Sequence, residues 1–415
     1  MKHHLLYTHP IPKFPIVWWE NVTPELVMKA AYYDEHGGES KLKVSDYMIR
    51  PKPSDGQILI KVHASCVNPV DVKLHENNVP RQFLPLPKIV GTDVCGTVIT
   101  VDRSRSNAFE IGDRVVAMMP HLFSGWGSAC EYVAIDERLA CHAPNNANDL
   151  EAASLPLVGL TVLQGFESFV EHHRHDTAGK CVLIQAGAGG LGTFAIQYCK
   201  YFLDMVVYAT CSTRNKDFVR SLGADYAIDY TCEDFDDVVQ DMDVVFDPLC
   251  HLYEDRTFRS QVLKPRVSSI ENGEFLPYYC GVISLIDFLT EIWLLMVKQG
   301  SFYIKVASSP HALQQEDRDP LGLAIPEAQP RKLVQGWCSW LVRSMLFHMG
   351  CGVTHYDAIY VRPDGARLAQ VVELVESGKI KPVVDHVFPL AQIAEAHAQV
   401  RQGHTRGKVA LRISS

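Results

Sequence analysis

A glycine-rich turn between an apolar run and a helical run constrains this chain more than any other stretch. The run Cys181–Ile184 is short enough to be a strand that is buried on both faces. Gly187, Gly189 and Gly192 follow in the spacing G-x-G-x-x-G, and apolar residues then recur at helical spacing over 194–202. Strand, glycine turn and helix in this order form a dinucleotide-binding fingerprint, because the turn lets the backbone approach a pyrophosphate and the helix offers N–H groups to it.

The whole turn is expected to hold the cofactor. This interpretation assigns cofactor binding to Gly187, Ala188, Gly189, Gly190, Leu191 and Gly192. Further apolar runs follow at 205–210, 226–228 and 243–247, and a helical stretch lies between the first two at 216–222. Strands that alternate with helices predict a parallel, doubly wound α/β sheet of the Rossmann type.

The end of the second apolar run indicates which nucleotide binds. NAD sites usually carry Asp or Glu about twenty residues past the glycines, whereas 210–216 contains hydroxyls and two cations, with no acid before Asp217. Ser212 can donate to a 2′-phosphate, and Arg214 or Lys216 can pair with its charge. We therefore expect NADPH; the alternative is a solvated loop that caps the next helix.

Composition and charge limit the classes of partner, compartment and site that this chain can have. A chain of 415 residues has room for two domains. The net charge of −9, without a basic stripe, makes nucleic acid an unexpected partner. The twelve cysteines include no C-x-x-C, which favours a reducing compartment over a disulfide framework or a cysteine zinc site. We expect no membrane span, a cytoplasmic or mitochondrial location, and a small-molecule substrate; a homodimer stays open.

Residues 27–135 contain many short apolar runs separated by turn residues, which predicts a small β-barrel-like domain. Specific stretches then resemble the medium-chain dehydrogenase/reductase superfamily, and within it the zinc-independent quinone oxidoreductases. These stretches are N-P-V-D-V-K at 68–73, P-L-P-K-I-V-G-T-D-V-C-G at 85–96, G-L-T at 159–161 and G-H-T-R-G-K at 403–408. The chain is most similar to the mitochondrial reticulon-interacting branch of NADPH oxidoreductases, although 251–354 departs from the family pattern.

The resemblance implies a domain organisation. A GroES-like catalytic domain is expected at 1–157, with an N-terminal arm at its start, and it resumes at 365–415. A Rossmann domain with an atypical insert occupies 158–364. The active site is expected in a crevice between the two domains.

The resemblance also implies a chemistry. Zinc alcohol dehydrogenases of the superfamily carry a ligand Cys where Asn68 stands and a ligand His where Thr92 stands, so no metal is expected here. Without a Lewis acid, quinones and α,β-unsaturated carbonyls are the easier hydride acceptors, because charge spreads onto an oxygen that a few fixed donors can stabilise. We expect Asn68 and Lys73 to be these donors. By resemblance, Thr161 holds the nicotinamide carboxamide and Tyr230 packs by the 2′-phosphate.

Each assignment has an alternative. Asn68 before Pro69 could serve turn chemistry alone, Lys73 could be a solvated lysine, and Tyr230 could simply end a strand. The chain could also be a cofactor-binding scaffold with little turnover, whose partner surface would be the aromatic 251–354 segment. The missing zinc ligands disfavour a secondary alcohol dehydrogenase.

Overall fold

The computed structural model describes residues 26–76, 84–102, 108–120, 124–249, 262, 302–306, 355–359 and 361–414. The chain forms two compact units: unit 1 contains Met1–Leu160 and Val361–Ser415, and unit 2 contains Thr161–Tyr360. The first division, between Leu160 and Thr161, falls in the helix Pro156–His172, which also contains the predicted boundary between residues 157 and 158. The predicted N-terminal arm and most of the 251–354 segment lie outside the described residues.

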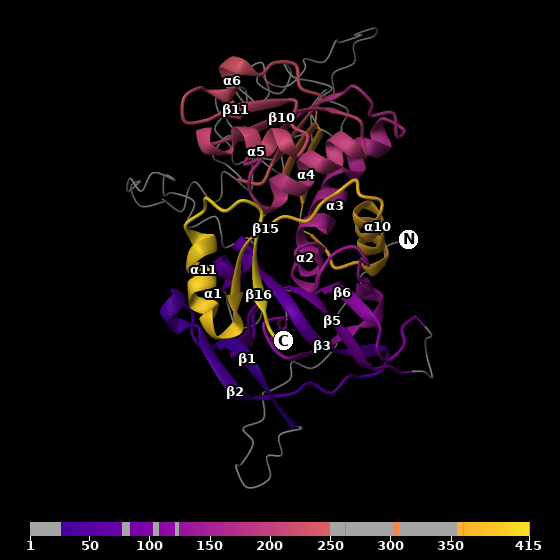
Figure 1. The fold of residues 1–415 in the computed structure, drawn as a ribbon, viewed down its shortest axis with the longest axis vertical. Helices are drawn as coiled ribbons and strands as arrows, with labels where there is room; N and C mark the ends of the chain where they lie inside the picture. The colour runs from indigo at the N-terminus through magenta and orange to yellow at the C-terminus, as the bar shows by residue number, and fades with distance from the viewer. Residues whose placement is uncertain are drawn as a thin grey trace, which may run out of the picture. The chain divides into compact units, whose positions relative to one another are not determined.

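Unit 2 is built on a six-stranded parallel sheet, seen with its helices in Figure 1. Its strands are β9 (Cys181–Ile184), β10 (Val206–Cys211), β11 (Tyr226–Asp229), β12 (Val244–Asp247), β13 (Phe302–Val306) and β14 (His355–Ile359). The spatial order β11-β10-β9-β12-β13-β14 reverses at β9, as in a Rossmann sheet. The prediction of a doubly wound parallel sheet is confirmed.

The central position of β9 explains its uninterrupted apolar sequence. β10 and β12 pair with β9 on its two sides, and Val182, Leu183 and Ile184 are fully buried. In the part of this unit that the structure describes, the helices are α4 (Gly190–Tyr201), α5 (Lys216–Ser221), α6 (Phe235–Val238) and most of α3 (Pro156–His172). Phe166 of α3 stacks on Phe246 of β12 with 5.6 Å between ring centroids, which packs the helix against the sheet.

Unit 1 contains a three-stranded and a seven-stranded sheet. The smaller has the order β2-β1-β4, and the larger has the order β15-β16-β3-β5-β6-β8, with β7 also paired to β3. The strands are β1 (Val27–Tyr33), β2 (Lys43–Ile49), β3 (Gln57–Val67), β4 (Lys88–Ile89), β5 (Asp93–Thr100), β6 (Arg114–Met118), β7 (Tyr132–Asp136), β8 (Ala140–His142), β15 (Val384–Pro389) and β16 (Lys408–Arg412). The helices are α1 (Pro69–Glu76), α2 (Asp149–Ala153), α10 (Gly365–Glu376) and α11 (Ile393–Arg401), with the first turn of α3.

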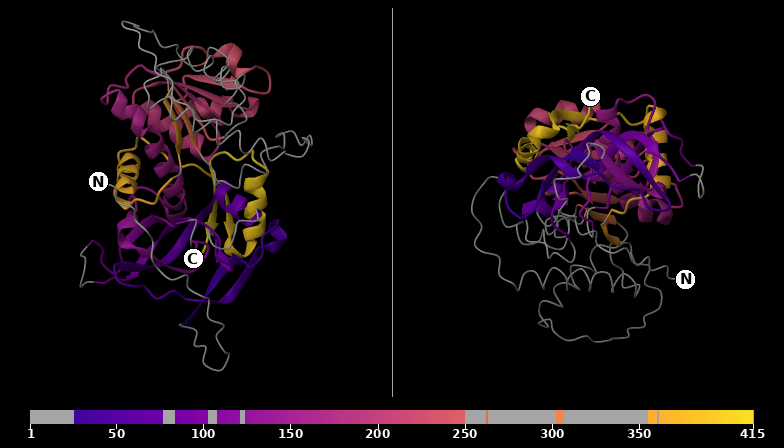
Figure 2. Two further views of the ribbon diagram at one scale, coloured as in Figure 1. Left: turned by 180° about the vertical axis from the view of Figure 1, so that it is seen from behind. Right: turned by 90° about the horizontal axis from the view of Figure 1, so that it is seen from below.

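The last part of the chain completes the sheet that its first part begins. β16 lies between β15 and β3, with Val409 opposite Val67. Figure 1 and both views of Figure 2 show these yellow C-terminal elements among the indigo strands of the same unit. The sequence did not predict α1 and α11, which pack against each other.

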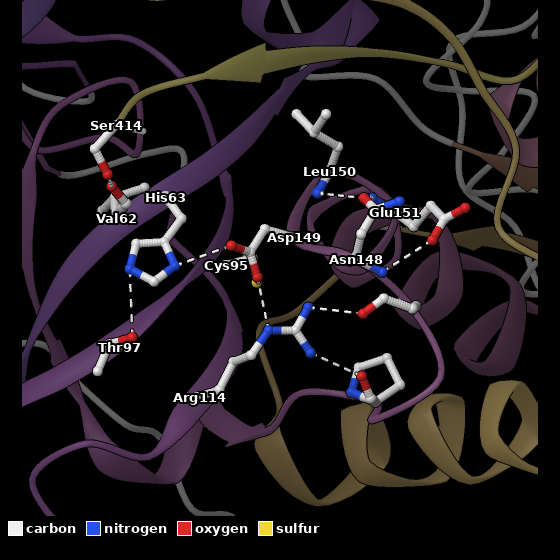
Figure 3. A network of polar contacts seen from close by, with 12 residues as sticks. Val62, His63, Cys95, Thr97, Arg114, Asn148, Asp149, Leu150, Glu151 and Ser414 are labelled. Carbon is white, nitrogen blue, oxygen red and sulfur yellow. Dashed lines mark hydrogen bonds and ion pairs between the residues drawn. The ribbon is translucent and has the colours of Figure 1, made fainter.

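A polar network fixes α2 just before the start of α3 (Figure 3). Asn148 caps α2 by accepting from the backbone N–H groups of Leu150 and Glu151, and the Glu151 carboxylate accepts from the Asn148 N–H in return. The Asp149 carboxylate accepts from Arg114 Nε at 2.6 Å and lies 3.0 Å from His63 Nδ1. These bonds tie the helix to β3 and β6.

The Asp149 network yields a stability prediction. Asp149→Ala should lower the free energy of unfolding by about 1–3 kcal/mol, because the half-buried Arg114 guanidinium loses its charged acceptor and keeps only the carbonyl oxygens of Pro144 and Ala147. The matched control is Asp34→Ala, which removes an exposed ion pair with Lys43 and should cost less than about 1 kcal/mol. Urea unfolding of the two variants measures both costs. Equal costs would show that the Asp149 network does not stabilise this part of the fold.

Candidate active site

The glycine turn after β9 is shaped by close backbone approach. The N–H of Gly187 donates to Thr210 O at 2.8 Å, which joins the turn to β10. A Cβ on Gly192 would lie 2.3 Å from Ala186 O and 2.6 Å from the Cα of Gly187, so glycine alone fits there. The third glycine is thus required by the packing of α4 on the turn.

The second glycine of the turn leaves the N-terminus of α4 without a side-chain cap. Gly189 occupies the N-cap position and has no side chain with which to cap the helix. The first-turn N–H groups, on Gly190, Leu191 and Gly192, have no partner within the helix and suit an anion. This part of the predicted site therefore fits a dinucleotide pyrophosphate in its backbone chemistry.

The predicted 2′-phosphate residues gather at the carboxyl edge of two paired strands. Ser212 follows β10 and Tyr230 follows β11, and the N–H of Tyr230 donates to Cys211 O at 3.1 Å. Arg214 is exposed, Lys216 is half-buried and Tyr230 is 47% exposed. The loops after β10 and β11 also touch each other through their threonine hydroxyls. The structure thus brings Ser212, Arg214, Lys216 and Tyr230 to one edge.

Two acids at this edge were missed by the sequence reasoning, because they follow the neighbouring strand. Glu233 Oε1 lies 3.9 Å from Lys216 Nζ and accepts from the N–H of Asp229. The Asp229 carboxylate is buried and accepts from the backbone and hydroxyl of Thr231. Burial alone would raise the pKa of Asp229, but its bonds with Thr213 and Thr231 outweigh burial and lower it. Glu233 therefore partly neutralises one of the two predicted phosphate-binding cations.

The remaining predicted residues divide between the units. Thr161 lies buried on the part of α3 that belongs to unit 2. Asn68 and Lys73 belong to unit 1, where Asn68 immediately precedes α1 and Lys73 is half-buried on that helix.

Asn68 is the centre of a buried polar cluster and not a simple turn residue. Its Nδ2 donates to Thr92 Oγ1 at 3.1 Å and to Asp93 Oδ2 at 2.8 Å. Its Oδ1 accepts from Lys408 Nζ. Both amide hydrogens already have acceptors, so a direct bond from Asn68 to a substrate would require the exchange of one of them. The substrate-binding role of Asn68 stays a prediction.

Asp93 and Lys408 complete the cluster; neither residue was assigned a role from the sequence, although both lie in family motifs. Lys408 Nζ lies 3.0 Å from Asp93 Oδ2, and both side chains are buried. Burial would lower the pKa of Lys408, but the carboxylate of Asp93 outweighs burial and raises it. Asp93 Oδ1 also accepts from the N–H of Leu157 at the start of α3.

Asp71 lies beside Asn68 and accepts from its backbone N–H at 2.8 Å. Burial raises the pKa of Asp71 to about 7, although the bond from Asn68 opposes the shift. The cluster thus combines the paired charges of Lys408 and Asp93 with a second carboxyl group, whose pKa is raised by burial. Among the described residues no group of three or more His, Cys, Asp or Glu is placed to hold a metal ion. Nor does any described helix have the length and apolar character to cross a membrane.

Comparisons with known proteins cover nearly the whole chain. A model of the alcohol dehydrogenase GroES-like domain matches 54–145, and a model of a zinc-binding dehydrogenase matches 222–411. A chloroplast envelope quinone oxidoreductase homolog of Arabidopsis thaliana is 30% identical over 386 residues, which cover 92% of this chain and 98% of the relative. The human mitochondrial NAD(P)H oxidoreductase RTN4IP1 is 29% identical, over 93% of this chain and 89% of its own length.

Two further similarities concern substrate and structure. The chloroplastic NADPH-dependent alkenal/one oxidoreductase of Arabidopsis thaliana is 38% identical over 227 residues, or 54% of this chain and 57% of the relative. The structure of the quinone oxidoreductase from Coxiella burnetii superimposes with a TM-score of 0.68 at 25% identity, covering 94% of this chain and all of that one.

The glycine turn supports a matched pair of substitutions. Gly192→Ala should lower the melting temperature and abolish dinucleotide binding, because its Cβ would lie 2.3 Å from backbone. Gly189→Ala should melt close to the unsubstituted protein, because the nearest atom lies at 3.4 Å, but it should weaken binding by crowding the pyrophosphate. Thermal unfolding and cofactor titration separate the two effects. A Gly192→Ala variant with unchanged stability would contradict the packing described here.

Proposed function

Because this chain belongs to the medium-chain dehydrogenase/reductase superfamily and is an oxidoreductase, we propose that it transfers hydride from NADPH to quinones or α,β-unsaturated carbonyls without zinc. Relatives named for quinones and for alkenals or enones support the substrate class. Individual residues support the three finer parts of this proposal, which are the preference for NADPH, the independence from zinc and the substrate.

One observation carries the proposal. Asn68 and Thr92, at the two positions where zinc-dependent members have ligands, are hydrogen-bonded to each other at 3.1 Å. An amide and a hydroxyl are poor zinc ligands but good partners for an oxygen anion. Such partners suffice for conjugated carbonyls and quinones, because the negative charge that hydride transfer creates on these acceptors is delocalised and only part of it lies on the oxygen.

When bound, NADPH supplies the hydride. We assign the pyrophosphate to the turn Gly187, Ala188, Gly189, Gly190, Leu191 and Gly192. The 2′-phosphate is assigned to Ser212, Arg214, Lys216 and Tyr230, and the nicotinamide carboxamide to Thr161. In unit 1, Lys73 and the Asn68 cluster stabilise the developing oxygen anion.

A substrate panel tests the reaction. Purified protein should oxidise NADPH with quinones and with enals or enones, should contain well under one zinc per chain, and should keep its activity with a chelator. Lys73→Ala and Asn68→Ala should each lower kcat by about 10²–10³-fold while NADPH affinity holds, as expected when an oxyanion donor, or a side chain that positions one, is lost. Absence of turnover on the whole panel would favour the scaffold alternative, and stoichiometric zinc that leaves together with the activity would refute zinc independence.

The pair Lys216–Glu233 gives a sharper test of the cofactor. NADPH should bind about ten- to a hundredfold more tightly than NADH, since one charge-assisted contact is worth roughly 1.5–3 kcal/mol. Lys216→Glu should erase much of this preference. Glu233→Gln should increase it, because the amide can still accept from the Asp229 N–H but no longer neutralises Lys216.

Fluorescence titration of both cofactors into the three proteins measures these changes, and NADH serves as the internal control because its affinity should hardly move. Equal binding of NADH and NADPH by the unsubstituted chain would show that this edge does not hold the phosphate. The cytoplasmic or mitochondrial location and a homodimer stay proposals beside this one; relatives named as mitochondrial support the second compartment.

A further inference from the structure

The amide of Asn68 is held in one orientation by two neighbours whose chemistry allows one role each. The Lys408 ammonium can only donate, so the Asn68 oxygen must face it. The Asp93 carboxylate can only accept, so the Asn68 nitrogen must face it, at 2.8 Å. The second amide hydrogen is then directed to Thr92 Oγ1 at 3.1 Å. The direction of hydrogen bonding through Asn68 is therefore fixed.

Thr92 is the last member of this series. A hydroxyl can accept and donate at once, and Thr92 already accepts from Asn68. Among the described residues, no acceptor is found for the hydrogen of the Thr92 hydroxyl. Thr92 is only 1% exposed, so bulk water does not compete for this hydrogen. The series runs from Lys408 to Asn68 to Thr92 and ends in a hydroxyl hydrogen for which the described residues provide no acceptor.

The charge at the head of the series strengthens the donor at its end. Lys408 is buried and paired with Asp93, so its ammonium acts through a low-dielectric interior. An ammonium on the amide oxygen draws electron density from the amide nitrogen, which makes its N–H a stronger donor. The Thr92 oxygen that accepts this bond becomes a stronger donor in turn, by about 10–30% per bond in a hydrogen-bonded chain.

We propose that Thr92 is the catalytic residue that donates a hydrogen bond to the oxygen of the enolate or hydroquinone anion formed by hydride transfer, and that Asn68 and Lys408 are positioning residues that act through it. The inference rests on the proposed reductase function and deepens it. In an enone, hydride adds to the β-carbon, the C=C electron pair forms the C=C bond of the enolate, and the carbonyl π pair moves to the oxygen; in a quinone the same shift gives the hydroquinone anion. Thr92 stabilises the oxygen anion while keeping its own proton. Water supplies the proton that completes the product.

Thr92→Val and Thr92→Ser form the matched pair for the test. Thr92→Val keeps the shape and removes the donor, and kcat should fall about 10²–10³-fold with NADPH affinity unchanged. Thr92→Ser keeps the hydroxyl and should stay within about tenfold of the unsubstituted chain. The loss in Thr92→Val should be larger for enones than for quinones, because less of the enolate charge is delocalised; a purely structural role predicts equal losses.

Two further variants test the positioning residues. Asn68→Asp keeps the size and the pairing with Lys408. Its carboxyl group shares one proton with Asp93, because two carboxylates this close do not both ionise. The oxygen that faces Thr92 therefore accepts, and the Thr92 hydrogen should turn toward it. Its kcat should fall as in Thr92→Val. Lys408→Met combined with Asp93→Asn removes both buried charges together, a change that proteins often tolerate. This double variant should bind NADPH normally and turn over more slowly, because the amide loses its polarising cation.

The outcomes separate this inference from the proposed function. Absence of quinone or enone turnover in the unsubstituted chain defeats both. Turnover that survives in Thr92→Val, or that falls as far in Thr92→Ser as in Thr92→Val, overturns the inference alone. If Thr92→Val does not give folded protein, Asn68→Asp decides, and an unchanged kcat in that variant rejects the role of Thr92.

Discussion

The buried carboxylate of Asp93 holds together parts of the chain that are otherwise unrelated in sequence. It is fully buried and interacts with three donors: the N–H of Leu157, the amide of Asn68 and the ammonium of Lys408. These donors stand at the start of α3, before α1 and on β16. An ionised carboxylate is costly to bury unless it is paired and hydrogen-bonded, so each of these elements must be in place for the others to be stable.

The Asp93 contacts also join the start of α3 to the Asn68 cluster. The carboxylate accepts a backbone N–H in the first turn of α3, where the helix dipole favours a negative charge. α3 then continues as the first helix of unit 2. The same carboxylate orients the Asn68 amide through its second oxygen. The start of the helix that carries Thr161 and the geometry of the Asn68 cluster are therefore set by one side chain.

Local sequence patterns predicted the structural features that depend on residues close to one another in the chain. The apolar run of β9, the glycine turn and the helix after it lie within about two dozen residues, and their order already implied a parallel sheet. The short amphipathic helices α1 and α11 gave too weak a periodicity to be recognised before their mutual packing was seen.

The parts of the candidate site that the sequence missed depend on residues brought together only by the fold. Lys408 lies 340 residues after Asn68, and nothing near either residue indicates the other. Glu233 was overlooked beside Lys216 because it follows the adjacent strand and not the same one. The motifs therefore predict which residues form the candidate site, but the direction of its hydrogen bonds could not be deduced without the partners of Asn68.

The position of β16 has a consequence for the order in which the protein is made. Translation reaches β16 only after all of unit 2, yet β16 pairs with β3, which is translated near the beginning. Unit 2 is continuous in sequence and can fold as it emerges, as domains generally do during synthesis. Until then, the stretch of β3 that pairs with β16, Ala64–Val67, lacks its partner strand along one edge, a state that favours pairing with other chains. A nascent chain of this protein therefore needs protection at the end of β3 until β16, its last strand, has been translated.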